Sequence, residues 1–205
     1  MTALSNYALT SLADVKESLS ITGTSQDNLI RRKINQATDM IESFCGKNNS
    51  QHFISTTYTS EEYDGTGTDQ LILKNRPVIS ISNFSERNTT QNVNSWTTID
   101  SQDYFVDLTA GVIDCRFGIL PAWNLYKVTY IAGFATIPSD LAEACVMLSS
   151  ALVENAAGGN AVKQKTQGPK SIAYYDNSQT SSLIEQLGID DMLQRYTQIP
   201  ILPDK

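Results

Sequence analysis

The spacing of the apolar residues changes twice along this chain, and this change constrains the fold more than any other feature. In the first segment apolar residues recur at intervals of four and three, at Ile30, Ile34, Ala37, Ile41 and Phe44. That spacing is typical of one face of an α-helix. Between about Ile54 and Phe134, short runs rich in β-branched residues indicate strands. The helical spacing then returns, so an antiparallel β segment interrupts a helical chain.

These patterns predict an α+β fold. The expected architecture is a helical bundle, with two N-terminal helices, a long central helix and short C-terminal helices, interrupted by an antiparallel β insertion. We expect a discontinuous helical adaptor domain made of residues 1–53 and 135–196, a β insertion over residues 54–134, and an extended C-terminal tail over residues 197–205.

Several element boundaries carry local signals. Ser11, followed by Asp14, is typical of the N-cap of a helix that begins at Leu12. Gly46 can end the second helix in the left-handed conformation. Proline at position 138 suits the start of the third helix, because it lacks only an N–H that would be unpaired there. Gly111 can take a positive φ and predicts a hairpin connection after Asp107.

Charge and cysteine usage exclude several classes of function. The formal net charge is −7, from 15 basic and 22 acidic residues, and there is no long basic block. Tight nucleic-acid binding depends on Lys and Arg neutralising phosphates, so the chain is a poor candidate for it. The three cysteines are far apart and form no CxxC pair, which argues against a disulfide framework and against a zinc site.

Catalytic motifs are equally scarce. His52 is the sole histidine and lies in a polar stretch after a helix end, where we interpret it as solvated. HExxH, P-loop and GxSxG patterns are absent, so we expect no enzyme, no cofactor and no metal. No apolar run approaches the roughly 18 residues that span a bilayer, and residues 1–10 do not look like a secretory signal. We therefore expect a soluble protein made in the cytoplasm.

Three segments are candidate contact surfaces. A basic cluster near the start of the second helix predicts either a solvated face or an inter-subunit contact; it comprises Arg31, Arg32 and Lys33. An exposed acidic hairpin is predicted from Glu61, Glu62, Asp64 and Asp69; these residues miss the EF-hand spacing, so a turn is favoured over a calcium loop. The C-terminal tail contains two prolines and cannot be helical, and its anchors are Tyr196, Ile199, Ile201 and Leu202.

The order of short motifs resembles that of the head–tail connector, or adaptor, proteins of long-tailed bacteriophages. The motifs, in chain order, are Leu12-x-Asp14-Val15-Lys16, Ile41-Glu42-x-Phe44-Cys45-Gly46, Tyr63-Asp64-Gly65-x-Gly67, Leu71-x-Leu73-x-x-x-Pro77-Val78, Val128-x-Tyr130-x-Ala132-Gly133-Phe134 and Ile137-Pro138-x-Asp140-Leu141-x-x-Ala144. The resemblance covers roughly residues 9 to 155, and none of the motifs encodes chemistry.

This resemblance implies a structural virion protein in the neck, made in the host cytoplasm. Its relatives form a ring, usually of twelve copies, below the portal protein. The ring prolongs the channel for double-stranded DNA, which passes without specific binding, and it presents a docking surface to a neck, stopper or tail completion protein. The resemblance also implies that a terminal segment grips the portal. No membrane and no cofactor belong to this role.

Two other functions are compatible with parts of the sequence. A carbohydrate- or receptor-binding β module of a virion would use aromatic residues for stacking, and the candidates are Trp96, Tyr104, Trp123 and Tyr126. An enzyme that uses paired carboxylates for acid–base work would use residues such as Asp100 and Asp103. Aromatic residues in strands are more often core, and acidic pairs in turns are usually solvated, so both alternatives are disfavoured.

Overall fold

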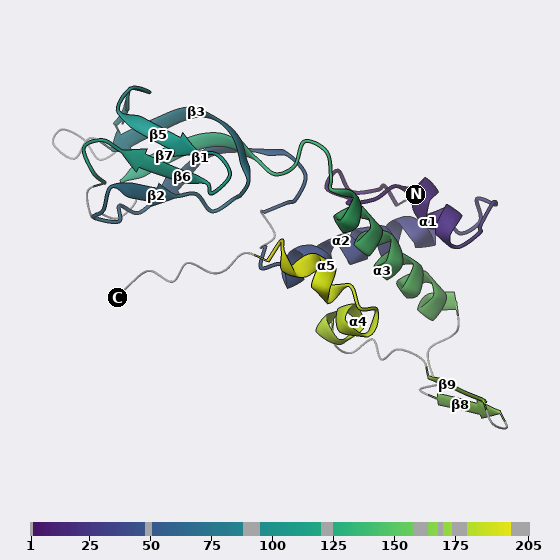
Figure 1. The fold of residues 1–205 in the computed structure, drawn as a ribbon. Coiled ribbons are helices and arrows are strands. Elements are labelled where there is room, and N and C mark those ends of the chain that lie inside the picture. The colour runs from purple at the N-terminus through teal and green to yellow at the C-terminus, as the bar shows by residue number, and fades with distance from the viewer. Residues whose placement is uncertain are drawn as a thin grey trace. The chain divides into compact units, whose positions relative to one another are not determined.

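The structure is a computed structural model of the 205-residue chain, and it describes residues 2–47, 51–87, 95–119, 125–157, 164–167, 170–173 and 180–197. The chain divides into two compact units. We call residues 1–53 with 137–205 the helical unit, and residues 54–136 the β unit. Figure 1 shows the elements of both units, which are described separately below.

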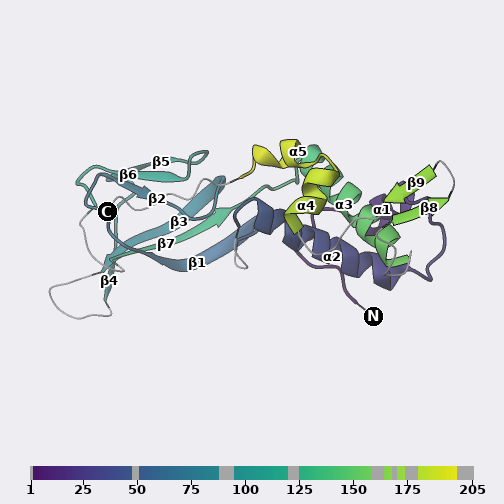
Figure 2. The ribbon, with the colours of Figure 1, turned by 90° about the horizontal axis from the view of Figure 1, so that it is seen from below.

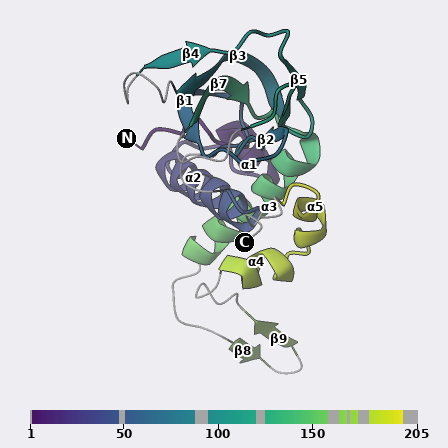
Figure 3. The ribbon, with the colours of Figure 1, turned by 90° about the vertical axis from the view of Figure 1, so that its left-hand side faces the viewer.

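The helical unit is built on three helices, α1 (Leu12–Ser18), α2 (Asp27–Phe44) and α3 (Ser139–Ala157) (Figure 3). The predicted capping of α1 is confirmed. The Ser11 side chain accepts a hydrogen bond from the Asp14 backbone, and the Asp14 carboxylate accepts one from the Ser11 backbone. Gly46 has a φ of 78°, as predicted for the end of α2.

The periodic residues of α2 make the core of this unit. Four of the five predicted positions, Ile30, Ile34, Ala37 and Ile41, are fully buried, whereas Phe44 is half-buried. Two sides of α3 are also buried. On one side, Val146 and Val153 pack in a cluster with Val15, Ile30 and Ile34. On a second side, the buried residues are Leu141, Ala144, Leu148 and Leu152. A helix buried on more than one side needs several packing partners.

The C-terminal part of the helical unit contains a hairpin and two short helices. The hairpin pairs β8 (Gln164–Gln167) with β9 (Lys170–Ala173). The helices are α4 (Thr180–Gln186) and α5 (Asp190–Gln194). Gly188 separates the helices, with a φ of 66°.

The β unit contains two antiparallel sheets. Its strands are β1 (Thr56–Tyr63), β2 (Gln70–Ile72), β3 (Val78–Arg87), β4 (Trp96–Thr98), β5 (Tyr104–Asp107), β6 (Val112–Cys115) and β7 (Tyr126–Ala132). One sheet has the order β1-β7-β3-β4, and the other has the order β2-β6-β5. Figure 2 shows the two sheets as separate layers within the unit.

The two sheets share one hydrophobic core. Alternate residues of β7 point inward, namely Tyr126, Val128, Tyr130 and Ala132, and they pack in one cluster with Leu71 of β2 and Ile113 of β6. Phe84 of β3 meets Tyr104 of β5 edge to face, with ring centroids 5.3 Å apart. The β unit therefore has a core of its own.

The predicted hairpin connection between β5 and β6 is confirmed. The Asp107 carboxylate accepts hydrogen bonds from the backbone N–H groups of Thr109 and Ala110, both at 2.9 Å. Gly111 has a φ of 68°, and a Cβ placed on it would lie 2.5 Å from a carbon of the Arg76 side chain. A residue with a side chain would be strained there.

The expected fold class, a helical bundle with a long central helix and a β insertion, is wrong. Seven strands form two antiparallel sheets around their own core, so the chain is a mixed molecule of helices and sheets. The helices are not arranged around one long central helix, because α3 has 19 residues, α2 has 18 and the others have five or seven. An apolar period identifies the buried face of an element but not the element that covers it.

Candidate docking surfaces

The end of α5 is joined to the start of α3 by a polar contact. The Tyr196 hydroxyl donates a 2.7 Å hydrogen bond to Asp140 Oδ1, and Arg195 Nη1 lies 3.0 Å from Asp140 Oδ2. The Tyr196 ring also meets Phe53 edge to face, at 5.9 Å between centroids. These contacts hold the end of α5 against α3 and Phe53.

The contact shifts the ionisation of both partners. The hydrogen bond from Tyr196, with the Leu141 N–H and Arg195, lowers the pKa of Asp140 below its usual value of 3.8. Burial and the neighbouring carboxylate raise the pKa of Tyr196 to about 12. The predicted anchor Tyr196 is thus half-buried in its own unit. The other three predicted anchors, Ile199, Ile201 and Leu202, lie outside the described residues.

Replacing Asp140 by asparagine should remove a pH-dependent part of the stability of the helical unit. Because the folded-state pKa of Asp140 is lowered, its contribution is complete above the unfolded pKa and is lost as the pH falls through the folded pKa. We therefore expect the wild type to melt above Asp140→Asn at pH 6, and the difference to shrink toward zero as the pH falls below 3.8 and through the lowered folded pKa. Asp191→Asn, at an exposed carboxylate of α5, is the control and should show no such convergence. An Asp140→Asn offset that stays constant over this range would contradict the assignment.

The predicted acidic hairpin contains two kinds of carboxylate. Glu61 is half-buried on β1 and accepts hydrogen bonds from the hydroxyls of Tyr63 and Tyr130. The two hydroxyls lie 2.9 Å apart, and burial raises the pKa of both tyrosines. Lys74 Nζ lies 3.9 Å from Glu61. Glu61 therefore organises an internal network of the β unit.

Glu62 belongs to a second cluster on the opposite face of β1. Its carboxylate lies 3.5 Å from Arg87 and 3.5 Å from Lys127, which is its register partner on β7. Both cations lie over the Trp96 ring, at 4.8 Å for the Arg87 guanidinium and 4.0 Å for Lys127 Nζ. Asp64 and Asp69 are exposed, so an exposed acidic tip is limited to these two residues.

The predicted basic cluster lies on α2. Arg32 is exposed, while Arg31 and Lys33 are half-buried, and Lys33 Nζ donates to Gln36 at 2.9 Å. Within the described residues no carboxylate forms an ion pair with Arg31 or Arg32. Asp27, the nearest acid of α2 toward the N-terminus, is already paired with Lys16 at 2.9 Å.

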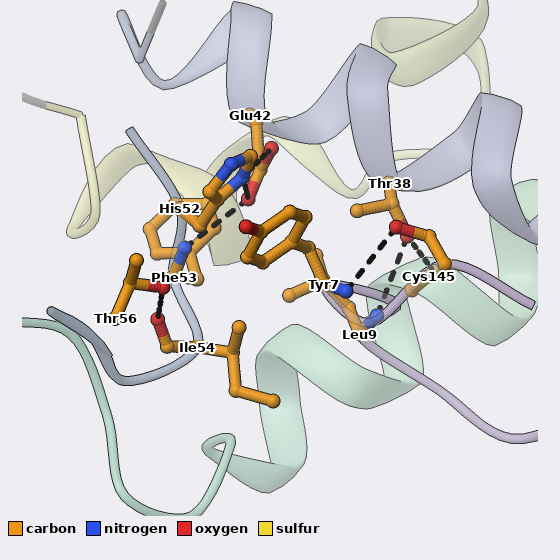
Figure 4. A network of polar contacts seen from close by, with 10 residues as sticks. Tyr7, Leu9, Thr38, Glu42, His52, Phe53, Ile54, Thr56 and Cys145 are labelled. Atoms are coloured by element: carbon orange, nitrogen blue, oxygen red, sulfur yellow. Dashed lines mark hydrogen bonds and ion pairs between the residues drawn. The ribbon is translucent and has the colours of Figure 1, made fainter. Parts of the chain in front are cut away.

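His52 is not the solvated loop residue that the sequence suggests. Its Nδ1 lies 3.1 Å from Glu42 Oε2, and its ring stacks on Tyr7 with centroids 3.5 Å apart (Figure 4). The Phe53 N–H donates to Glu42 Oε1 at 3.1 Å. Burial raises the pKa of Glu42, and the His52 contact opposes that shift. The group closes the C-terminal end of α2 and serves the packing of the helical unit.

The aromatic residues of the carbohydrate alternative are occupied by internal contacts. Tyr126 is buried, Tyr104 packs on Phe84, and Trp96 lies under two cations. Trp123 lies outside the described residues. Of the two carboxylates considered for acid–base work, Asp100 accepts the Gln102 N–H in a turn.

Two exposed phenylalanines were not singled out from the sequence. Phe105 of β5 is 70% exposed, and Phe117, in the turn after β6, is 79% exposed. The signal for Phe105 is the alternation along β5, because Tyr104 and Val106 both pack against the core. Phe117 lies between Arg116 and Gly118 in a turn, where a large apolar residue is not needed for packing.

The three cysteines are all free thiols. Burial raises the pKa of Cys45 to about 12, and it raises the pKa of Cys115 and of Cys145 to about 11. Within the described residues, no group of three or more His, Cys, Asp or Glu side chains could hold a metal ion. In the same part of the chain, no helix combines the length and apolarity needed to cross a membrane.

Comparison with models of known protein families gives a match to this chain. The sequence profile described as HCP, head completion protein, matches residues 8–186. A search of curated proteins finds no significant match.

The fold is also similar to chains of solved gene transfer agent (GTA) particles. The structures are the neck of an empty GTA particle computed with C6 symmetry (17% identity, TM-score 0.59), the neck of a native GTA particle computed with C12 symmetry (16%, 0.55) and the virion of a native GTA particle (15%, 0.53). In each case the match covers 98% of this chain and 95% of the other chain. Since the profile spans well over half of its residues, this chain belongs to the head completion protein family.

Proposed function

We propose that the chain is a structural component of the virion neck. In this role it forms a ring below the portal, extends the DNA channel and offers a docking surface to the next neck or tail protein. The observation that carries the proposal is the family match over residues 8–186. The likeness to GTA neck chains over nearly the whole length supports it, and one of those necks is described with C12 symmetry. We therefore propose a ring of twelve copies.

The described residues fit a structural role. The polar groups around Glu42 and Glu61 are used in packing networks. The net charge of −7 suits a channel that DNA must pass without sticking, because like charges repel. We propose no catalytic step.

Docking to the portal is assigned to the C-terminal tail. Tyr196, which precedes the tail in the sequence, is held against α3 and Phe53. Ile199, Ile201 and Leu202 are the proposed contacts with the portal, since an apolar extended segment fits a groove of a partner.

Ring assembly should depend on salt or on the portal as a template. Every copy carries a net charge of −7. The Debye length, over which charges still interact, is about 8 Å at 0.15 M salt and about 30 Å at 0.01 M. Repulsion between free copies is thus strongest at low salt. Native mass spectrometry of the chain with and without portal rings, at both salt levels, measures this. We expect rings with portal, and few without portal at 0.01 M. Equal ring yield without portal at every ionic strength would contradict the prediction, and no binding to portal would refute the proposed function.

A further inference from the structure

The two exposed phenylalanines lie at one end of the three-stranded sheet. Tyr104 of β5 pairs in register with Cys115 of β6. Phe105 is the next residue of β5 and pairs with Asp114, while Phe117 follows Cys115 by two residues, in a turn closed by a 3.1 Å hydrogen bond from the Gly118 N–H to the Cys115 carbonyl. An exposed apolar patch with a polar rim marks an interaction surface.

The rim of this patch is acidic. The Arg116 N–H donates to the Asp103 carbonyl at 2.8 Å, and the Cys115 N–H donates to the Asp69 carbonyl at 2.7 Å, so these two acids flank the end of β6. Asp114 pairs with Phe105 and faces the same side of the sheet. Next to these three acids lies one cation, Arg116, whose guanidinium is 6.0 Å from the centre of the Phe117 ring.

The negative charges at this end of the sheet also affect the pKa of the Cys115 thiol. Burial, followed by the negative charges of Asp114, Glu86 and Asp69, raises the pKa of Cys115 to about 11. The placement of Asp69, Asp103 and Asp114 favours a partner with positive charge over DNA, whose phosphates the acids would repel.

The basic cluster of α2 has the complementary character. Between Asp27 and Asp39 the helix carries three cations and no carboxylate. Arg31 and Arg32 form no ion pair within the described residues, and Arg32 is exposed. Complementary charges give an interface its specificity and register.

We propose that the Phe105–Phe117 end of the β unit docks on the Arg31–Lys33 face of α2 in a second copy of this chain. The inference rests on the proposed ring, because a contact between two different surfaces of the same chain is the kind that closes a ring by rotation. The phenyl groups supply the buried apolar centre, and the charge pairs around them fix the register. At a partly buried contact these pairs are screened less by salt than the net repulsion between whole copies.

Photo-cross-linking of the assembled complex tests the contact. Phe117 is replaced by p-benzoylphenylalanine in the full chain, and equal amounts of ¹⁴N- and ¹⁵N-labelled protein are assembled on portal rings and illuminated. We expect cross-links to residues 27–44 that join a light and a heavy chain. The control places the same photo-reactive group at Leu108, which is exposed at the opposite end of the same sheet, and should give no cross-link to α2.

Charge reversal provides the second arm. Arg31→Glu with Arg32→Glu should reduce the Phe117 cross-link about tenfold or more, because like charges then face each other. Adding Asp103→Lys and Asp114→Lys should restore it. Rings that form on portal while Phe117 cross-links elsewhere, or only within its own chain, would overturn the contact and leave the proposed function standing. A wild-type chain that does not assemble on portal at all would overturn both.

Discussion

Replacing Phe84 by alanine is expected to destabilise the β unit by about 3–5 kcal/mol. Phe84 is 1% exposed and contacts both sheets of the unit. Its ring meets Tyr104 at 5.3 Å and Tyr126 at 5.7 Å between centroids, and aromatic pairs of this kind add to the loss of buried area. The cavity left by the ring cannot be filled without moving the strands on both sides.

The matched control is Phe105→Ala. This residue has the same side chain on a strand of the same unit, but it is 70% exposed, so its removal should change the free energy of unfolding by no more than about 0.5 kcal/mol. The two tryptophans, Trp96 and Trp123, both lie within residues 54–136, so tryptophan fluorescence during urea unfolding reports on this unit. A loss below about 1 kcal/mol for Phe84→Ala, or equal losses for both variants, would contradict the assignment of the core.

The contrast between these two phenylalanines bears on the docking contact as well. Phe105→Ala should leave the fold intact, so any effect of it on assembly reports on contact between copies. Residues that matter for binding but not for stability are those whose apolar surface is left exposed by the isolated chain. Phe117, at 79% exposure, belongs to the same group.

Local elements of this fold are readable from the sequence because they depend on short-range rules. The spacing of Ile30, Ile34, Ala37 and Ile41 predicts the buried face of α2, and all four are fully buried. The cap at Ser11 and the positive φ of Gly111 also follow from chemistry within a few residues. The hairpin of β8 and β9 has a weaker signal, since β8 is polar throughout and β9 has only Ile172 and Ala173 as apolar residues.

The fold class could not be obtained in the same way. The strands of the β unit alternate as amphipathic strands do, but the partner of each inward face is not encoded locally. Leu71 and Ile113, on strands 40 residues apart, meet the inward side chains of β7 only in the folded unit. A sandwich with its own core and a β insertion on a bundle share the same local pattern.

For the candidate surfaces, too, the charges can be read from the sequence but the contacts cannot. The charges of Arg31, Arg32 and Asp69 are visible in the sequence, and the structure places Arg32 and Asp69 on exposed positions. The contacts of Glu61, Glu62, His52 and Tyr196 are not visible in the sequence, because each is paired with a residue distant in sequence or on another element. In the fold, Glu61 and Glu62 contact residues of neighbouring strands, while Asp64 and Asp69 are exposed.

Deleting residues 197–205 is expected to abolish binding to the portal ring while leaving the helical unit folded. The deletion retains Tyr196, its hydrogen bond to Asp140 and its contact with Phe53, and at the end of α5 it removes the hydrogen bonds that Thr197 donates to the Gln194 and Leu193 carbonyls. What is lost is the apolar segment with Ile199, Ile201 and Leu202. Sedimentation of the truncated chain with portal rings measures the binding, and circular dichroism measures the retained helix.

Two full-length variants separate the apolar anchors from the length of the tail. Ile199→Ser with Ile201→Ser and Leu202→Ser keeps the length and both prolines, and it should lose portal binding as the deletion does, because fully burying one such side chain contributes about 1.5–3 kcal/mol. Asp204→Ala with Lys205→Ala removes only the terminal charges and should bind as the wild type does. If the triple serine variant still binds portal, the apolar anchors are not the docking element. If the deletion still binds, docking must be carried by a surface of the folded units, and the acidic Phe105–Phe117 end would then have to be tested against the portal itself.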